Sequence, residues 1–258
     1  MTHVFFSYIL TYGQKWIKPV TLELGGKSPI IVFDDVSDLD KCVTECYHAL
    51  FWNAGQCCSA GSRIYVQRGV YEKFISAMAA KVSTRKLGSP LDKSTHQGPQ
   101  VNRQQMESVL QFIRDGIAEG ARHVCGSRGE RYAEKGFFVA PTVFADVKEH
   151  MRICREEIFG PVMSILVFDS AEEVLKRAND SEFGLVSAVY TSNISRAMYI
   201  SERLRTGIVW VNTFNYIDAA VPWGGFKQSG HGRDQGEACL AGFTTTRSTI
   251  IYYGDAKL

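Results

Sequence analysis

Hydrophobic positions along the chain alternate between short β-branched runs and amphipathic stretches. Short apolar runs of the kind that form buried strands occupy residues 29–33, 63–67, 163–168, 186–190 and 207–211. Apolar residues recur at helical spacing in residues 37–53, 70–82, 101–119, 171–179 and 195–204. A further strand-like run over residues 137–147 is broken at Pro141, and residues 244–253 predict one long final strand.

The order of these elements predicts an α/β fold. Strands separated by helices need crossover connections, which give a mostly parallel sheet with helices on both faces. Ser37 is expected to cap the first of these helices and Gly55 to end it, while Ser170 starts a later one. Residues 29 to about 240 read as one domain, and the final strand is expected to pair with another domain or another chain.

Composition excludes several classes of protein. The 258 residues are 45% hydrophobic and 22% charged, as in an ordinary globular protein. A formal net charge of +2 gives no electrostatic case for nucleic acid or an anionic membrane as a partner. The apolar start of the chain is too short for a membrane span and lacks the basic region of a signal peptide.

The cysteines indicate reduced thiols rather than cross-links. Their number, seven, is odd, and no two are spaced as Cys-x-x-Cys, which disfavours a disulfide framework and a zinc ribbon. We therefore expect a cytoplasmic protein. Cys42 and Cys46 lie one helical turn apart, but core packing explains them better than a metal, and the six histidines show no ligand spacing.

Residues 53–63 are the most informative segment for chemistry. Cys57 and Cys58 stand side by side in a Gly-rich turn between a predicted helix and a predicted strand. A thiol on such a turn can face a pocket and act as a nucleophile. Neighbouring side chains do not point at one site, so at most one of the two is catalytic. The alternative is that both pack as small hydrophobic residues.

Three further segments carry polar residues beside glycines. Glu23 precedes Gly25-Gly26 and a buried strand, and is either a general base with a pKa raised by burial or part of a surface turn. Glu156 and Glu157 precede another turn and either bind ribose hydroxyls or end a solvated helix. Residues 222–233 are Gly-rich, but no strand leads into them as a dinucleotide fingerprint requires.

Taken together, these segments resemble the NAD(P)-dependent aldehyde dehydrogenase family. The matching motifs, in family order, are Glu-Leu-Gly-Gly-Lys-Ser-Pro at 23–29, Gly-Gln-Cys-Cys-Ser-Ala-Gly-Ser-Arg at 55–63, Gln-Gly-Pro-Gln-Val at 97–101, Glu-Glu-Ile-Phe-Gly-Pro-Val at 156–162 and Pro-Trp-Gly-Gly-Phe-Lys at 222–227. Each motif alone is moderately specific. All five in order, within a resemblance that spans residues 14–253, are very specific.

The resemblance implies a role for individual residues. Cys58 matches the nucleophile that attacks an aldehyde, and Glu23 matches the base that activates water to hydrolyse the resulting thioester. The expected contacts of an NAD or NADP cofactor are Glu157, Phe159, Gln100 and Gly25. The expected residues of the substrate pocket are Trp52, Trp223, Cys57 and Ser59. Residues 213–221 match the loop that shapes substrate choice, and no metal is implied.

The resemblance also implies that half of the family's architecture is missing. Family chains are roughly twice this length, and the coenzyme-binding domain precedes the part matched here. We expect residues 1–22 to be a remnant of that domain with an unmatched start, residues 23–240 the catalytic domain and residues 241–258 an oligomerisation strand. We expect a truncated form that binds NAD weakly or not at all and has weak or no activity alone. A homo-oligomer is also expected. The alternatives are a non-catalytic module that assembles with itself or a full-length partner, and a cysteine-dependent esterase or hydrolase.

Overall fold

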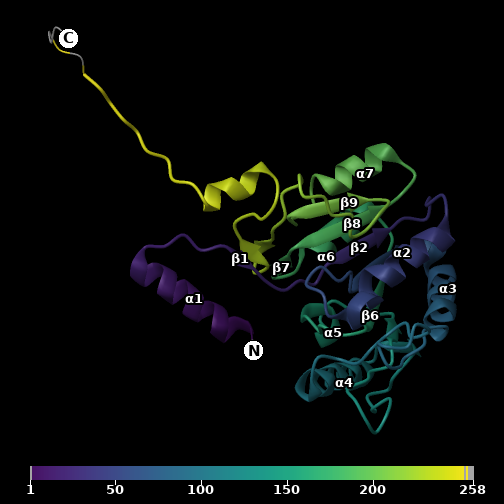
Figure 1. Cartoon of the computed structure of the whole chain (residues 1–258). Coiled ribbons are helices and arrows are strands. Elements are labelled where there is room, and N and C mark those ends of the chain that lie inside the picture. Colours follow the sequence, from purple (N-terminus) through teal and green to yellow (C-terminus); the bar gives the residue numbers. More distant parts are fainter. Residues whose placement is uncertain (1, 253, 255–258) are drawn as a thin grey trace.

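A seven-stranded sheet forms the centre of the molecule (Figure 1). A computed structural model describes residues 2–252 and 254 of the chain. In spatial order the strands are β4 (Arg122–Cys125), β5 (Thr142–Ala145), β6 (Val162–Phe168), β3 (Arg63–Gln67), β2 (Pro29–Val32), β8 (Val186–Tyr190) and β9 (Ile208–Val211). All neighbouring strands are parallel except β4 and β5. The predicted mostly parallel sheet is therefore confirmed.

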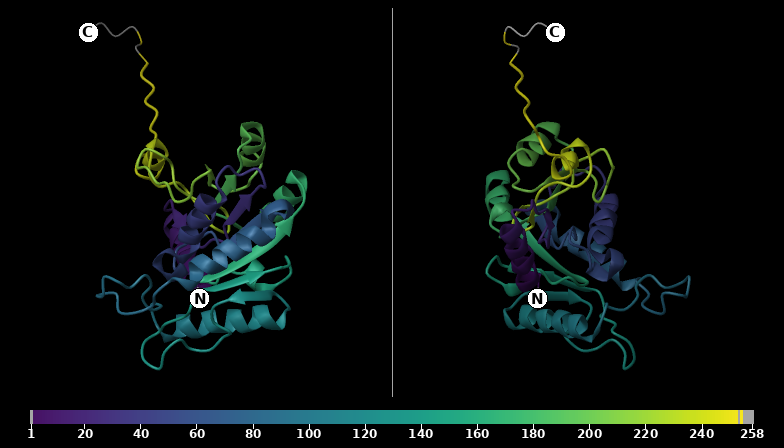
Figure 2. Two further views of the ribbon diagram at one scale, coloured as in Figure 1. Left: turned by 90° about the vertical axis from the view of Figure 1, so that its right-hand side faces the viewer. Right: turned by 60° about the vertical axis from the view of Figure 1, so that its left-hand side comes forward.

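Helices cover both faces of this sheet (Figures 1 and 2). One face packs against α2 (Leu39–Phe51) and α3 (Tyr71–Ser83). The other packs against α4 (Arg103–Ala118), the short α5 (Arg152–Arg155), α6 (Ala171–Asn179) and α7 (Ile194–Ser201). Short 3₁₀ helices lie at Trp52–Gly55, Arg68–Val70 and Glu237–Gly242. Both core layers are apolar, which explains why the strands read as continuous hydrophobic runs.

Side chains of the strands alternate between the two core layers. Ile30 and Val32 of β2 pack with α2 and α3, while Ile31 packs on the opposite face. Polar caps fix where α2, α4, α6 and α7 begin. Asp38, rather than the expected Ser37, caps α2 by accepting a hydrogen bond from the Lys41 amide at 2.8 Å.

Two short antiparallel strand pairs position the polar segments of the chain. Strand β1 (Leu22–Glu23) pairs with β11 (Gly230–His231), and β10 (Phe226–Lys227) pairs with β7 (Phe183–Gly184). The register sets Glu23 opposite Gly230. The Gly-rich segment near the end of the chain is thereby folded back onto the segment that carries Glu23.

The two ends of the chain differ from the sequence-based expectation. Residues Thr2–Trp16 form helix α1, an element that the hydrophobic pattern did not predict. Residues 244–252 form no strand and extend away from the domain, and residue 253 of the predicted strand lies outside the described residues (Figure 1). The short edge strand β4 was also missed. In the described part of the chain no helix is long and apolar enough to cross a membrane.

Candidate active site

A tight turn after α2 presents the two neighbouring thiols. Three consecutive residues, Asn53, Ala54 and Gly55, have positive φ angles of 49°, 56° and 73°. A Cβ at Gly55 would lie 2.2 Å from the carbonyl oxygen of Gly160, so only glycine fits there. This turn reverses the chain direction and delivers Cys57 and Cys58 to the ends of the central strands.

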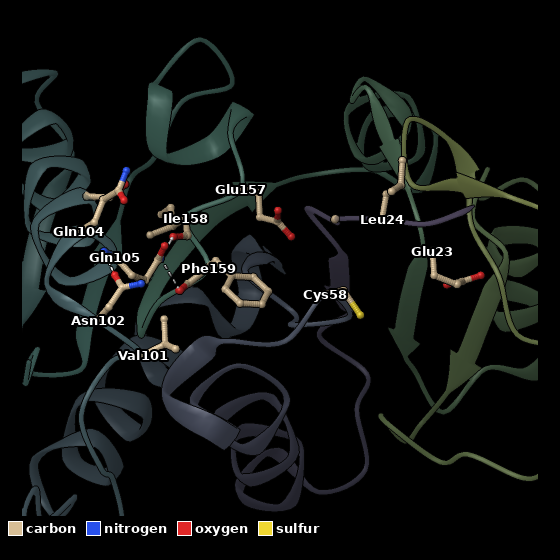
Figure 3. A pocket seen from close by; sticks show the side chains of 12 residues that line it. Glu23, Leu24, Cys58, Val101, Asn102, Gln104, Gln105, Glu157, Ile158 and Phe159 are labelled. Atoms are coloured by element: carbon tan, nitrogen blue, oxygen red, sulfur yellow. Dashed lines mark hydrogen bonds between the residues drawn. The ribbon is translucent and has the colours of Figure 1, made fainter. Parts of the chain in front are cut away.

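The two thiols face different cavities. Cys58 lines a cavity of about 520 Å³ together with Glu23, Gly25, Glu157 and Phe159. Figure 3 shows its sulfur atom between the carboxylates of Glu23 and Glu157.

Cys57 lines a separate cavity of about 470 Å³ on the other side. Its wall also contains Trp52, Ser59, Phe214 and Asn215. The turn therefore separates a carboxylate-lined side from a mostly apolar side.

The thiol pair is electrostatically unequal. A hydrogen bond with Cys58 is the main reason why the pKa of Cys57 is lowered to about 6, and the Ser59 hydroxyl, 3.2 Å from the Cys57 sulfur, adds to this effect. The same hydrogen bond raises the pKa of Cys58, and burial raises it further. Because the two thiols share a hydrogen bond, the pair loses its first proton more readily than its second.

Glu23 occupies a half-buried position beside this turn. Its Oε2 accepts a hydrogen bond from the Trp223 indole at 3.1 Å, whereas its Oε1 is buried and has no partner among the described residues. Burial raises the pKa of Glu23, and the nearby charge of Asp234 raises it further, while Trp223 and Arg233 act in the opposite direction. A carboxylate in this state suits general-base chemistry.

Glu157 approaches the backbone through two glycines. Its Oε1 accepts a hydrogen bond from the Gly26 amide at 2.9 Å, and a Cβ at Gly25 would lie 2.4 Å from its Oε2. A Cβ at Gly26 would lie 2.4 Å from the carbonyl oxygen of Cys58. The paired glycines thus allow Glu157 and the Cys58 backbone to approach the segment between β1 and β2 closely. Burial raises the pKa of Glu157, against the Gly26 amide and Lys27.

The structure corrects one expected cofactor contact. Gln100 is 2% exposed, points toward the Ala54 carbonyl at 3.3 Å and does not line the cavity of Cys58. Gln105 lies five residues after Gln100, in α4. It lines that cavity and donates to the carbonyl oxygens of Ile158 and Phe159 at 3.1 and 2.9 Å. The helical start at Arg103 turns this second glutamine, not the first, toward the site.

The residues expected on the substrate side separate into two groups. Trp52, Cys57 and Ser59 line one cavity. Ser59 donates to Asn215 at 3.3 Å and so ties the turn to the loop of residues 213–221. Trp223 is not among the residues that line this cavity, and its indole N–H is instead directed at Glu23.

Lys27 is a buried cation that the sequence analysis did not single out. It is 1% exposed, and its Nζ has no hydrogen-bond partner among the described residues. Burial lowers its pKa to about 7, opposed by the neighbouring Cys154 and Glu157. A protonated Lys27 favours the ionised form of Glu157. The sequence signal for Lys27 was its place in the motif directly after Gly26, but that place does not indicate that the side chain is buried.

Trp223 offers a direct test of the pKa of Glu23. The indole N–H stabilises the ionised carboxylate, so Trp223→Phe is expected to raise the pKa of Glu23 further. One lost hydrogen bond corresponds to about one pH unit or less. Any step that needs ionised Glu23 then reaches half its maximal rate at a higher pH. The hydrolysis rate of an acylated Cys58, measured against pH, checks this, and an unmoved profile or a shift to lower pH would contradict it.

Comparison with known proteins identifies the fold and motifs. The sequence model described as the aldehyde dehydrogenase family matches residues 5–249. The chain belongs to the aldehyde dehydrogenase family. This match begins within the segment for which the motifs gave no resemblance, at residue 5 rather than after residue 13. Helix α1 is therefore mostly inside the matched region.

Individual relatives give the same result at high identity. Retinal dehydrogenase 2 of Gallus gallus is 47% identical over 239 residues, which cover 93% of this chain and 46% of that protein. The mitochondrial aldehyde dehydrogenase of Mesocricetus auratus is also 47% identical, with 93% and 47% covered. The chain thus spans about half the length of the curated relatives that it matches.

A solved relative shows the same coverage in three dimensions. The structure of an aldehyde dehydrogenase from Bacillus cereus in complex with NAD⁺ superposes with a TM-score of 0.90 at 46% identity. It covers 94% of this chain, and this chain covers 49% of it.

Among the described residues no group of three or more histidine, cysteine or acidic side chains could hold a metal ion.

Proposed function

We propose that this chain carries the catalytic half of an enzyme that oxidises an aldehyde to a carboxylic acid with NAD⁺ or NADP⁺. The observation that supports this most strongly is the Cys58 thiol standing between two half-buried carboxylates in one cavity. Cys58 is the proposed nucleophile and Glu23 the proposed base. The Bacillus cereus relative was solved with NAD⁺ bound, which supports the choice of cofactor.

In the first step the Cys58 thiolate adds to the aldehyde carbon. A carbon–sulfur bond forms, and the carbonyl electron pair moves to oxygen to give a thiohemiacetal anion. The first negative charge of the thiol pair lies on Cys57, so Cys58 passes its proton to the Cys57 sulfur as it becomes the attacking thiolate. The Cys58 backbone N–H is the proposed donor to the oxyanion.

The cavity of Cys58 fits a nicotinamide cofactor. Glu157 uses one carboxylate oxygen for Gly26, which leaves the other to accept from a ribose hydroxyl. The space that a Cβ at Gly25 would fill is kept free, and Phe159, with Gln105 bonded to its carbonyl oxygen, lines the same wall. When bound, the nicotinamide supplies the acceptor for the hydride that leaves the thiohemiacetal carbon and converts it to a thioester on Cys58.

In the last step Glu23 activates water against the thioester. The Glu23 carboxylate, which lines the cavity of Cys58, takes a proton from a water molecule, whose oxygen attacks the thioester carbonyl. The carbon–sulfur bond then breaks, the carboxylic acid leaves and the electron pair returns to the Cys58 sulfur. Because this step needs only Cys58 and Glu23, the chain can also hydrolyse activated esters, and this esterase reaction is the second proposed activity.

The isolated 258-residue chain is expected to bind NAD⁺ weakly. It contains the proposed contacts to the nicotinamide ribose, but the resemblance assigns most of the coenzyme-binding surface to a domain outside these residues. Isothermal titration calorimetry of the isolated chain is expected to give a dissociation constant in the millimolar range, on the order of 4 kcal/mol of binding free energy. A micromolar constant would contradict this expectation.

Assembly and environment complete the proposal. We propose that the chain self-associates or joins a longer copy, because Trp16, Ile17, Ile250 and Tyr252 are 63%, 92%, 94% and 91% exposed. Light scattering of the purified chain distinguishes an oligomer from a monomer, and a monomer would count against the proposed assembly.

A reducing, cytoplasmic environment is proposed because all seven cysteines are free and Cys58 must stay a thiol.

A further inference from the structure

A third cavity adjoins the cavity of Cys57 and is lined by basic groups. It has a volume of about 560 Å³, and its basic lining residues are His48, Lys81, Arg85 and His96. No carboxylate is among its lining residues. It shares His48 and Trp52 with the cavity of Cys57. The two cavities therefore meet along the exposed end of α2.

The two permanent charges of this cavity have no counter-ion. The Lys81 ammonium lies 5.5 Å from the centre of the Tyr47 ring, and the Arg85 guanidinium lies 5.3 Å from the same ring. Within the described residues neither forms an ion pair, whereas Arg122 and Arg152 each pair with two carboxylates. Stacking on an aromatic ring holds a cation in place but leaves its charge uncompensated.

Hydrogen bonds within the protein orient His96 and Arg85 in this cavity. The Nδ1 atom of His96 accepts a hydrogen bond from the Lys86 amide at 3.1 Å, so a neutral His96 carries its proton on Nε2. Arg85 directs its own N–H groups at Gln97, the Tyr47 hydroxyl and the Phe51 carbonyl. All three guanidinium nitrogens of Arg85 are thus engaged within the protein. The Lys81 ammonium is the group left to donate to a bound anion.

His48 reports on the charge of this cavity. Its pKa is lowered, first by burial and then by the charges of Lys81 and Arg85. The nearest acidic residue on α2, Glu45, lines the neighbouring cavity and accepts from the Tyr190 hydroxyl at 2.9 Å. An anion placed between Lys81 and His48 would cancel the repulsion and stabilise protonated His48.

We propose that this cavity is a binding site for a carboxylate or phosphoryl group carried on the far end of the aldehyde substrate. In this proposal the aldehyde enters the cavity of Cys57 past Trp52 and meets Cys58 at the turn that separates the two cavities, while its anionic end stays with Lys81, Arg85 and His96. This inference rests on the proposed function for its substrate, but the anion site itself does not. The remaining source of the same chemistry is free inorganic phosphate.

The first arm of the test measures anion binding without any catalysis. The pKa of His48 is followed by NMR in the 258-residue chain with inorganic phosphate or with sodium chloride at the same ionic strength, and His48→Gln assigns the signal. Phosphate is expected to raise the pKa of His48. In Lys81→Met the phosphate concentration for half the shift is expected to rise about tenfold, the loss of one charged hydrogen bond.

Lys86→Met is the matched control for this arm. The Lys86 side chain pairs with Asp92 outside the cavity, and its backbone amide, which holds His96, is unchanged. Phosphate binding to this variant is expected to equal that of the parent chain. An unmoved His48 pKa, or an equal effect of the two lysine substitutions, would overturn the anion site.

The second arm distinguishes the two sources of the anion. Two activated esters of equal chain length, one ending in a carboxylate and one in a methyl group, acylate Cys58 in competition with phosphate. The carboxylate-ended ester is expected to react about tenfold faster, and Lys81→Met or phosphate removes this advantage. Equal rates alongside a phosphate-shifted His48 would overturn the substrate assignment and leave a free-anion site. Failure of both esters to acylate Cys58 would instead refute the proposed nucleophile.

Discussion

Cys58→Ala is expected to abolish the burst of 4-nitrophenolate that the chain releases from 4-nitrophenyl acetate. Removal of a catalytic nucleophile costs on the order of 10³-fold or more in the acylation rate, because no other group takes over the covalent step. Cys58 is the thiol that lines the cavity between the two carboxylates. Stopped-flow absorbance in the first turnover measures the burst separately from slow hydrolysis.

Cys57→Ala is the matched control, because it removes a neighbouring thiol from the other cavity. The burst is expected to remain. Its pH dependence is expected to move to higher pH, because the pair loses its first proton with a pKa of about 6, whereas burial raises the pKa of a lone Cys58. A burst that survives in Cys58→Ala and disappears in Cys57→Ala would reverse the assignment of the two thiols.

Glu23→Gln is expected to stop the reaction at the acylated enzyme. The amide cannot accept the proton of a water molecule, and loss of a general base slows such a step by about 10²–10⁴-fold. The glutamine carbonyl can still accept from the Trp223 indole, so the local structure is expected to persist. Intact-protein mass spectrometry after mixing with the ester measures the accumulation and decay of the acyl adduct.

Glu156→Gln provides the control for that substitution. Glu156 lies beside Glu157 but is exposed and pairs with Arg152, so its carboxylate does not reach the cavity. The adduct on this variant is expected to decay at the parent rate. Equal decay in Glu23→Gln and the parent chain would exclude Glu23 as the base.

The fold was predictable where burial on both faces dictated the pattern. Strand β8 and helix α6 have the predicted bounds, because every residue of β8 is buried and Ser170 caps α6. Residues 244–252 form no strand among the described residues, and their expected pairing with another domain or another chain stays a prediction. Their β-branched composition favours an extended chain, but a strand needs a partner ladder, and no described residue pairs with this segment.

Helix α1 shows the opposite limitation. Its residues were judged only as a membrane or signal segment, and several of its large side chains, such as Tyr12 and Trp16, are exposed. An apolar face that packs on no core gives no periodic signal that distinguishes a helix from an irregular apolar segment.

The candidate site divides in the same way. The motifs predicted Cys58, Glu23 and Glu157, and the structure brings their side chains to one cavity. The exchange of Gln100 for Gln105 was not predictable, because both are polar and only the start of α4 decides which one faces the site. Two neighbouring thiols likewise cannot be assigned to opposite cavities until the positive φ angles of the preceding turn are known.

The position of the acyl group tests the central claim most directly. The Glu23→Gln chain is mixed with 4-nitrophenyl acetate, quenched in acid and digested, and the peptide that contains Cys57 and Cys58 is fragmented by tandem mass spectrometry. The account predicts one acetyl group on the Cys58 sulfur. An acetyl group on Cys57, or an unmodified peptide after complete ester turnover, would contradict it.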